Sequence, residues 1–315
     1  MAAGAPTAPM AWAARLRSYL ELVRFSHTIF ALPFAIMAAL IAARTSLADG
    51  SGPAHLAGWL RPAAGILLCM VSARTAAMAF NRLADRAFDA ANPRTASRHL
   101  PRGVLGVGEV VSLVVASAAA FVASTLLFLP NRLPLALSVP VLAWLLGYSY
   151  AKRFTMFAHV WLGAALGLAP VAAWIALRGP RLLAEPADGL PAVVLGLAVT
   201  AWVAGFDTIY ACQDASFDAA HGLRSIPAGL GVPRSLAVAV VLHGVALVLL
   251  CLLPAVVPQL GPIYWLAVAA ITALLVWEHS IVRPHDLSRV NEAFFTANAL
   301  IGVVLLVAIG VDLWW

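Results

Sequence analysis

The sequence predicts an all-α, polytopic membrane protein. Hydrophobic residues make up 63% of the 315 residues, whereas charged residues make up only 11%. A soluble globular domain carries about 25% charged residues, so this chain has too little polar surface to face water on all sides. The apolar residues also gather in long runs, and a helix needs about 20 of them to cross the hydrocarbon core of a bilayer. Lipid is therefore the expected solvent for most of the chain.

Nine stretches of the chain are candidate membrane-spanning helices. Turn and helix-stop signals rich in Pro, Gly and charge separate them, such as Asn92-Pro93-Arg94 and Arg178-Gly179-Pro180-Arg181. We expect a single transmembrane domain over residues 18–315, preceded by a cytoplasmic N-terminal tail over residues 1–17. The nine predicted spans cover approximately residues 18–43, 62–90, 107–129, 132–150, 156–178, 190–213, 235–254, 261–278 and 293–314.

The two sides of the predicted bundle differ in positive charge. The side that holds the N-terminus also holds the loops after the second, fourth, sixth and eighth spans, and most Lys and Arg residues lie there. Because positive residues favour the cytoplasm, we expect this side to face the cytoplasm of a bacterial inner membrane. The formal net charge of +6 is not gathered in one basic run with interleaved aromatics, so we expect no nucleic-acid partner.

Most acidic residues lie in two motifs, at the ends of the second and sixth spans. Steps of four and of seven residues return to nearly the same face of a helix, so each motif places its side-chain oxygens along one stripe. Both motifs end even-numbered spans, which puts them on the same side of the membrane. The first motif is Asn81, Asp85 and Asp89, and the second is Asp207, Asp214 and Asp218, with Tyr210 beside it.

Acidic stripes at the membrane edge predict a metal site. Ionisable groups in a membrane are costly, and they usually face a cavity or one another. Mg²⁺ relieves the repulsion between carboxylates and leaves some of its ligand positions to water and substrate phosphate. Two Mg²⁺ ions could clamp a diphosphate between the motifs and favour its departure. The expected ligands are Asn81, Asp85, Asp89, Asp214 and Asp218, with help from Asp207.

Basic residues near the motifs are candidates for substrate binding, because Arg and Lys are the usual donors to phosphate oxygens. Lys152 and Arg153 share a very short loop, and we expect one or both to bind the diphosphate. Arg74 lies seven residues before Asn81, about two turns deeper, where an unpaired charge is costly. It either pairs with a motif carboxylate or binds the carboxylate of an acidic acceptor. Further candidates are Arg94 after the second span, and Arg24 and His27 in the first.

Together these residues resemble the UbiA superfamily of membrane prenyltransferases. That family carries Asn-x3-Asp-x3-Asp near the end of its second helix and a second Asp motif near the end of its sixth. The matching residues are Asn81, Asp85 and Asp89, followed by Asn92-Pro93-Arg94-Thr95, and then Asp207, Tyr210, Asp214 and Asp218. Further similar stretches are Arg24-Phe-Ser-His27, the run from Tyr148 through Lys152 and Arg153 to Thr155, and His221-Gly222-Leu223-Arg224-Ser225-Ile226-Pro227.

The resemblance implies nine transmembrane helices around a central cavity, with a lateral opening for a lipid tail. It also implies Mg²⁺ as cofactor and a polyprenyl diphosphate as donor. Arg74 and Arg153 would help to hold an aromatic acid acceptor similar to 4-hydroxybenzoate, and Tyr148, Tyr210 and Arg24 would belong to the substrate site. The chain departs from the ubiquinone-pathway members at Arg82, where they usually carry Asp. This departure leaves the identity of the acceptor open.

We therefore expect transfer of a polyprenyl group from its diphosphate to an aromatic acceptor, 4-hydroxybenzoate, in quinone biosynthesis. The expected catalytic residues are Asp85, Asp89, Asp207, Asp214 and Asp218. One alternative is a prenyltransferase of a menaquinone pathway that acts on another aromatic acid. A second is a secondary transporter, although transporters usually bind their ions near the midplane of the membrane. A third is an inactive or structural membrane protein.

Overall fold

The chain folds into a bundle of helices. The computed structural model describes residues 12–23, 32–53, 55–292 and 296–315. Short 3₁₀ helices lie at Leu126–Phe128, Tyr148–Tyr150, Pro186–Gly189 and Cys212–Asp214. The α-helices are α1 Trp12–Leu22, α2 Leu32–Ala48, α3 Ala57–Ala84, α4 Arg86–Ala91, α5 Val107–Thr125, α6 Leu133–Gly147, α7 Ala151–Phe154, α8 Ala158–Ala184, α9 Leu190–Ala211, α10 Ala215–Ala220, α11 Ile226–Leu230, α12 Val232–Val256, α13 Pro262–Ile281, α14 Val290–Glu292 and α15 Asn298–Trp314.

Seven helical segments in the described part of the chain are long and apolar enough to cross a membrane. They correspond to the second through eighth predicted spans. Two shorter apolar helices, α2 and α15, occupy the places of the first and ninth. The prediction of an all-α, multi-pass architecture is confirmed, and the count of nine spans stays a prediction. The seven segments are Ala57–Ala84, Val107–Phe128, Leu133–Phe154, Ala158–Ala184, Pro186–Ala220, Val232–Val256 and Pro262–Ile281.

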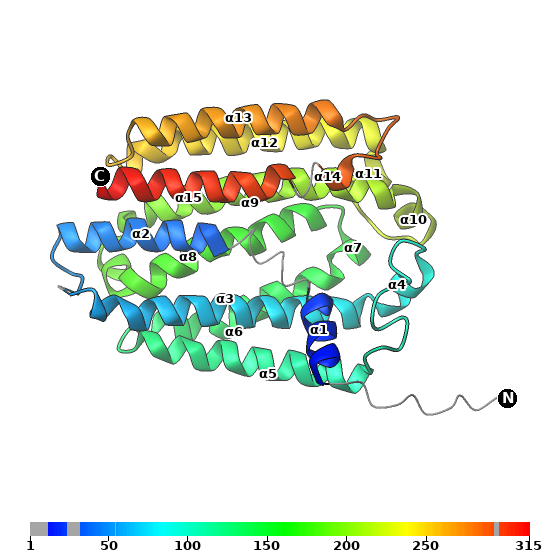
Figure 1. The fold of residues 1–315 in the computed structure, drawn as a ribbon, viewed down its shortest axis with the longest axis horizontal. Coiled ribbons are helices and arrows are strands. Elements are labelled where there is room, and N and C mark those ends of the chain that lie inside the picture. The colour runs from blue at the N-terminus through cyan, green and yellow to red at the C-terminus, as the bar shows by residue number, and fades with distance from the viewer. Residues whose placement is uncertain (1–11, 24–31, 54, 293–295) are drawn as a thin grey trace.

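The first predicted span, residues 18–43, was wrong as a single helix. Helix α1 ends at Leu22, and in the described residues α2 covers Leu32–Ala48. Helix α1 begins at Trp12, inside the segment expected to be a tail, and it runs across the bundle rather than along it (Figure 1). Its end packs Leu22 and Val23 against Ala79 of α3 and apolar residues near the start of α5.

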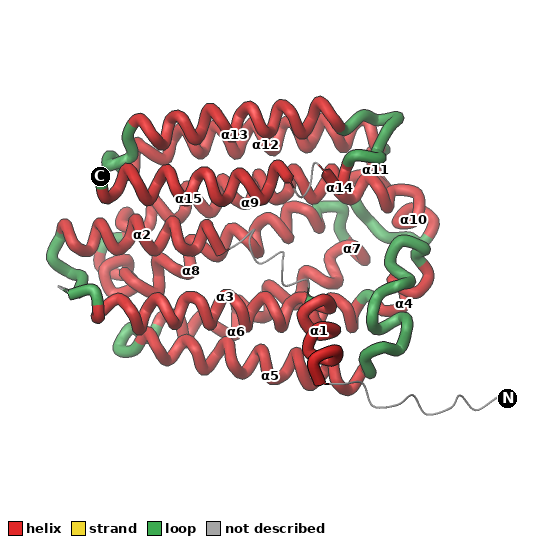
Figure 2. Tube along the Cα trace, in the orientation of Figure 1, coloured by secondary structure: helices red, strands yellow, loops and turns green. Residues whose placement is uncertain are grey.

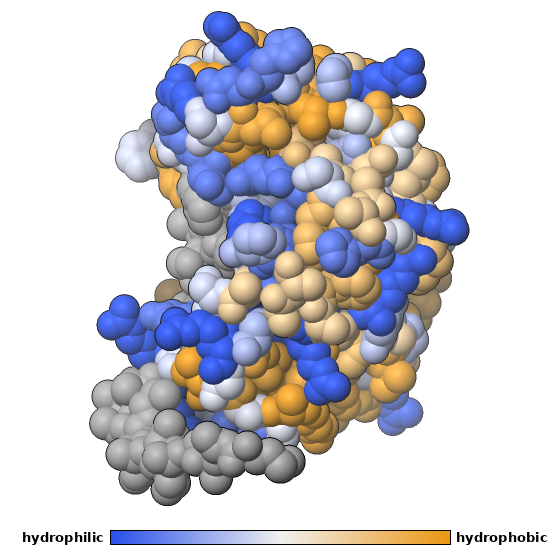
Figure 3. Space-filling model, turned by 90° about the vertical axis from the view of Figure 1, so that its right-hand side faces the viewer, coloured by the Kyte–Doolittle hydropathy of each residue, from blue (hydrophilic) through white to orange (hydrophobic). Residues whose placement is uncertain are grey.

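The long helices run side by side, and the short helices α4, α7, α10 and α11 gather at one end (Figure 1). Loops are confined to the two ends of the bundle (Figure 2). Figure 3 shows the end of the bundle that carries α4 and α10. Hydrophilic and hydrophobic residues are interspersed over this whole face. This end has the character of a membrane–water interface, and both acidic motifs lie there.

Helix α9 is the central helix of the bundle. In the Pro186–Ala220 segment, 67% of the most apolar window is buried, against 33% or less in the other six segments. Helices α8 and α12 pack on it. A Cβ atom at Gly163 of α8 would lie 2.2 Å from the Thr200 carbonyl oxygen of α9, and one at Gly167 would lie 2.4 Å from the Gly196 carbonyl. Glycine at these positions therefore lets α8 and α9 approach closely, as small residues do in membrane helices.

Candidate active site

The first acidic motif surrounds a break between two helices. Helix α3 ends at Ala84, and the six-residue helix α4 begins at Arg86. Asp85 lies between them with φ −96° and ψ 6°. The predicted continuous helix over residues 62–90 was therefore wrong at Asp85. The predicted shared face of the first two residues is nevertheless present, because the Asn81 amide donates to Asp85 Oδ2 at 2.8 Å.

The second motif breaks in the same way. Helix α9 ends at Ala211, a 3₁₀ turn follows, and the six-residue helix α10 begins at Ala215. Asp214 precedes that helix with φ −105° and ψ 4°, almost the backbone conformation of Asp85. Both residues lie in the sparsely populated bridge region, where many active-site residues are found. The two motifs thus share one local structure, in which an Asp sits at the junction of a long and a short helix.

The segment that follows the first motif contacts the second motif at Asp214. The amide of Asn92, at the end of α4, donates to Asp214 Oδ1 at 3.1 Å. Arg94 donates from Nε to the same oxygen at 2.8 Å and from Nη2 to Oδ2. Its Nη1 also donates to the Tyr210 hydroxyl at 3.2 Å. The sequence predicted Arg94 at the substrate and gave Asn92 as a turn signal and as part of the family resemblance, so the bridging role of Asn92 was missed.

The other motif carboxylates also have cationic partners. Asp89 accepts from Arg98 at 2.6 Å and lies 3.5 Å from Arg82. Asp218 is 3.0 Å from Lys152 Nζ, and Asp85 is 3.6 Å from Arg153. Burial raises the pKa of Asp85, the charge of Asp89 raises it further, and Arg153 opposes both. The ion pairs of Arg82 and Arg98 were not foreseen from the sequence.

Lys152 and Arg153 enter the site from α7. Lys152 pairs with Asp218 of the second motif and Arg153 pairs with Asp85 of the first, which places α7 between the motifs. Arg153 donates to the carbonyl oxygen of Ala84, the last residue of α3, at 2.6 Å. Its guanidinium lies over the Tyr150 ring, 4.6 Å from the ring centre. The sequence-based placement of both residues beside the motifs is therefore found in the structure.

Tyr148, Asp207 and Arg74 occupy different parts of this region. Tyr148 is half-buried and begins the short 3₁₀ helix that precedes α7. Asp207 accepts a hydrogen bond from His159 of α8 at 2.7 Å, a partner that sequence reasoning missed. Arg74 Nε is buried and has no hydrogen-bond partner among the residues that the structure describes. The pairing of Arg74 with a motif carboxylate is thus not found there.

Two of the expected site residues, Arg24 and His27, lie outside the described residues. The described ones contain no group of three or more His, Cys, Asp or Glu side chains placed to hold a metal ion. The predicted convergence of all the motif oxygens is therefore not confirmed. The donor set still suits a hard divalent cation, because it consists of carboxylate and amide oxygens from two motifs, and Asn92, just after the first motif, contacts Asp214 of the second.

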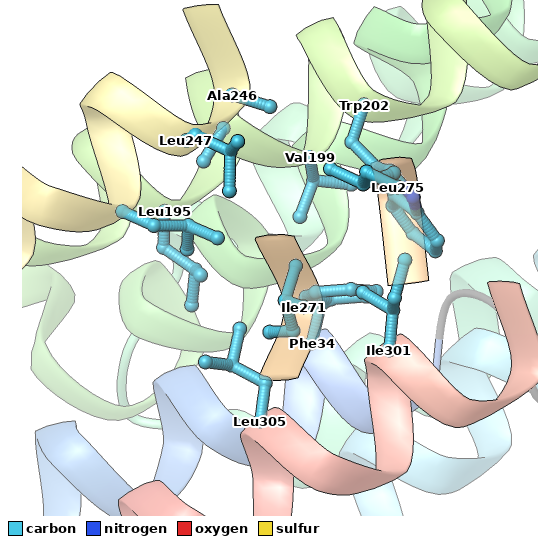
Figure 4. A pocket seen from close by; sticks show the side chains of 12 residues that line it. Phe34, Leu195, Val199, Trp202, Ala246, Leu247, Ile271, Leu275, Ile301 and Leu305 are labelled. Atoms are coloured by element: carbon cyan, nitrogen blue, oxygen red, sulfur yellow. The ribbon is translucent and has the colours of Figure 1, made fainter. Parts of the chain in front are cut away.

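A narrow apolar cavity lies elsewhere, among α2, α9, α12, α13 and α15 (Figure 4). Leu195, Val199 and Trp202 of α9 line it, together with Phe34 of α2 and Ile301 of α15. None of the sequence-predicted site residues lines this cavity. It is therefore not the central cavity around the motifs that the resemblance implied.

Known proteins give independent comparisons. Residues 31–300 match the model of the UbiA prenyltransferase family. The chain is 29% identical over 307 residues to a 4-hydroxybenzoate octaprenyltransferase of Aromatoleum aromaticum, covering 97% of each chain. It is 33% identical over 233 residues to the enzyme of that name from Alkalilimnicola ehrlichii, covering 74% of this chain and 76% of that one.

Solved structures agree with this relationship. A UbiA homolog from Aeropyrum pernix K1, solved in its apo form, matches with a TM-score of 0.79 and 35% identity, covering 91% of this chain and 98% of that one. A UbiA homolog from Archaeoglobus fulgidus bound to GPP and Mg²⁺ shares the fold with a TM-score of 0.63 at 19% identity, covering 93% and 99%. The family match spans most of the sequence and includes both acidic motifs. The chain is an integral, multi-pass membrane protein and belongs to the UbiA prenyltransferase family.

Proposed function

We propose that this protein transfers a polyprenyl group from its diphosphate to 4-hydroxybenzoate in quinone biosynthesis. The observation that carries the proposal is the junction at Asp214, where Asn92 and Arg94 join the two acidic motifs. Carboxylates and cations from two distant parts of the chain meet there, as a diphosphate site requires. The relatives named 4-hydroxybenzoate octaprenyltransferase support the choice of reaction and acceptor.

The donor diphosphate would bind between α4, α7 and α10. Arg94, Lys152 and Arg153 provide donors to its oxygens, because each already lies beside a motif carboxylate. Mg²⁺ would be held by Asn81, Asp85, Asp89, Asp214 and Asp218, and when bound it would neutralise the leaving diphosphate. The Archaeoglobus fulgidus homolog bound to GPP and Mg²⁺ supports Mg²⁺ as the cation and a prenyl diphosphate as the donor.

The reaction begins when the allylic C–O bond breaks and the diphosphate leaves with the electron pair. The resulting allylic cation is delocalised, and the ring carbon ortho to the acceptor hydroxyl attacks it. The ring then loses a proton and regains its aromaticity. The chain's own residues hold the diphosphate, orient the ring and exclude water, which would otherwise quench the cation. Apolar helices around the site would carry the prenyl tail into the lipid.

Arg74 is the proposed partner of the acceptor carboxylate. It lies on α3, the helix that leads into the first motif, and about two turns deeper in the membrane than Asn81. Its buried Nε has no partner among the described residues, and a buried guanidinium without one is costly. A benzoate that enters from the lipid side of the motifs would supply the missing acceptor. At this depth Arg74 would hold the acceptor carboxylate away from the diphosphate, with the aromatic ring of the acceptor between the two.

The acidic motifs and the cations around them lie at the end of the bundle that carries α4, α7 and α10 (Figure 1). We propose that this end faces the cytoplasm of a bacterial inner membrane, in agreement with the distribution of positive residues. Membership of a prenyltransferase family leaves the transporter alternative without support. A menaquinone-pathway acceptor remains a second candidate because of Arg82, which is buried and lies 3.5 Å from Asp89.

The experiment that tests the function uses membranes containing the protein, a labelled polyprenyl diphosphate and a panel of aromatic acids. We expect a product with the mass of prenylated 4-hydroxybenzoate. Membranes with Asp214→Asn serve as the matched control, because this change keeps the side-chain size and removes the charge. Prenylation of a different aromatic acid would favour the menaquinone-pathway acceptor instead of 4-hydroxybenzoate. No prenylated product with any acid would contradict the proposed function.

A further inference from the structure

Helix α7 is too short to hold itself in place. It consists of only four residues, Ala151–Phe154. Isolated helices shorter than about 12 residues are marginal in water, and the last four carbonyl groups of a helix have no partner inside it. Yet α7 carries Lys152 and Arg153, the two cations that pair with Asp218 and Asp85. Contacts from outside the helix therefore set the position of both cations.

Arg153 provides one of these contacts, on the side of the first motif. Its guanidinium donates to the carbonyl oxygen of Ala84 at 2.6 Å. Ala84 is the last residue of α3 and immediately precedes the helix break at Asp85. Arg153 therefore joins α7 to the end of α3.

Arg224 provides the contacts on the side of the second motif. Its backbone N–H donates to the Lys152 carbonyl oxygen at 2.6 Å. Its side chain donates from Nη1 to the Phe154 carbonyl oxygen at 3.0 Å. Because Phe154 is the last residue of α7, the Arg224 side chain caps the end of this helix while the Arg224 backbone binds its middle.

The loop that carries Arg224 is itself fixed to the second motif. The Leu223 N–H donates to the carbonyl oxygen of Asp218 at 2.9 Å. On the other side of Arg224, Ser225 is 0% exposed, and its Oγ accepts from the Ala228 N–H at 3.3 Å and caps α11. Arg224 therefore extends to α7 from a loop that is held on both sides of it.

Lys152 closes a ring of contacts with this loop. The Asp218 carboxylate lies 3.0 Å from Lys152 Nζ, and the Asp218 carbonyl binds Leu223. Arg224 follows Leu223 and returns to the Lys152 carbonyl. The backbone and the side chain of Lys152 are thus both bound to one short segment of the second motif. Arg224 is exposed and Asp218 is 2% exposed, so Lys152 is the cation beside the buried carboxylate.

We propose that Arg224 is a positioning residue that holds α7 so that the Lys152 ammonium meets the leaving diphosphate. This inference rests on the proposed function. When the allylic C–O bond breaks, its electron pair goes to the diphosphate, and Lys152 donates hydrogen bonds to the oxygens that gain charge. A donor that is already in place needs no reorganisation at that moment. Arg224 transfers no proton and touches no substrate in this step.

The alternative is that Arg224 binds the diphosphate directly with its own charge. A double-mutant cycle separates the two roles, because residues that act through one another give non-additive effects and independent residues give additive ones. The probe is inorganic pyrophosphate with Mg²⁺, and its affinity for the detergent-solubilised protein is measured from the concentration dependence of thermal stabilisation.

Arg224→Met is compared in the wild-type and Lys152→Met backgrounds. In the wild-type background we expect pyrophosphate binding to weaken by about 10-fold, the effect of losing one hydrogen bond from a charged group. In the Lys152→Met background we expect a loss of less than about 2-fold, since the residue that Arg224 positions is absent. In turnover, Arg224→Met should lower kcat/KM for the donor and leave the acceptor KM unchanged.

Two further variants and a control complete the cycle. Arg224→Lys keeps a charged donor of similar reach and should retain most of the affinity. Arg224→Gln is shorter and uncharged, and it passes through the same cycle, so the test does not depend on the folding of one variant. The control is Arg234→Met, because Arg234 is an exposed cation in the first turn of α12. Its pyrophosphate affinity and its donor kcat/KM should equal those of the wild type.

Equal losses in the two backgrounds would overturn the positioning role and would indicate direct contact between Arg224 and the diphosphate. A lower melting temperature with unchanged pyrophosphate affinity would also overturn it, since Arg224 would then only stabilise the fold. Failure of the wild type to prenylate any acid is a separate result that would contradict the proposed function, whereas the pyrophosphate cycle would still decide the role of Arg224.

Discussion

The Asn92 amide donates a hydrogen bond to Asp214 across 122 residues of sequence, at 3.1 Å. It fastens the end of α4 to the start of α10, so that the short helix of one motif faces the short helix of the other. Arg94, two residues later, binds the same carboxylate through two of its nitrogens. Asp214 is therefore the point at which the two halves of the site are joined.

Asp214→Asn tests this junction. The change keeps the size of the side chain but removes the charge that pairs with Arg94. We expect product formation to fall by at least about 100-fold, the loss typical of a group that stabilises developing charge. The measurement is labelled product per amount of membrane-inserted protein. Asp286→Asn, an exposed residue in the loop after α13, is the control and should retain full activity.

Removal of divalent cations tests the proposed metal. Because the expected ligands are all oxygens, EDTA should stop turnover, and added Mg²⁺ should restore it. The readout is the rate of prenylated product before chelation, after chelation and after the addition of Mg²⁺. Undiminished turnover in EDTA would show that the cations of the protein, such as Lys152 and Arg94, stabilise the leaving diphosphate without a metal.

Arg74→Ala tests the acceptor site. A hydrogen bond to a charged group contributes about 1.5 to 3 kcal/mol, so we expect the acceptor KM to rise by about 10- to 100-fold. The donor KM should change little, because Arg74 lies about two turns from the first motif. Arg74→Lys keeps the charge and should have a smaller effect, since it loses only the bidentate geometry. An unchanged acceptor KM in Arg74→Ala would exclude this residue from the site.

Much of the candidate site could be predicted from local spacing. A step of four residues placed Asn81 and Asp85 together, and the structure joins them at 2.8 Å. The placement of Lys152 near the acidic motifs followed from its loop after the fourth span, and the structure pairs it with Asp218. These relationships depend on the periodicity of a helix and on the alternation of spans across a membrane. Both can be inferred from the spacing of residues in the sequence.

The parts that could not be predicted depend on tertiary structure. His159 is a single polar residue at the start of an apolar helix, and its partner Asp207 is 48 residues away. No local pattern connects the two. The helix breaks at Asp85 and Asp214 were missed because Asp, Ala and Phe on either side are compatible with a continuing helix. The end of α1 at Leu22 was missed because an apolar run resumes at Ile29, after a short stretch of mixed polarity.

Far from the motifs, Arg178 holds the opposite end of the bundle together. Its side chain is 2% exposed and lies 2.7 Å from Asp49 and 2.6 Å from Asp188. It also donates to Ser46 of α2 at 2.7 Å, and Trp174 donates to Asp188 at 3.0 Å. The Arg178 guanidinium holds the pKa of Asp49 well below its usual range. This one residue therefore ties α8 to the end of α2 and to the turn before α9.

Arg178→Met should destabilise the fold without a direct effect on the chemistry. It keeps an apolar stem of similar length but leaves Asp188 buried without its cation, so we expect a loss of about 3 to 5 kcal/mol in the free energy of unfolding. Arg181→Met is the matched control on the same helix. Its ion pair with Glu185 is 47% and 58% exposed, so that change should be less than about 1 kcal/mol. The measurement is denaturant unfolding in detergent micelles. Equal losses in the two variants would show that Arg178 stabilises the bundle no more than a surface charge does. Adding Asp188→Asn to Arg178→Met should recover part of the lost free energy of unfolding, because it removes the unpaired charge.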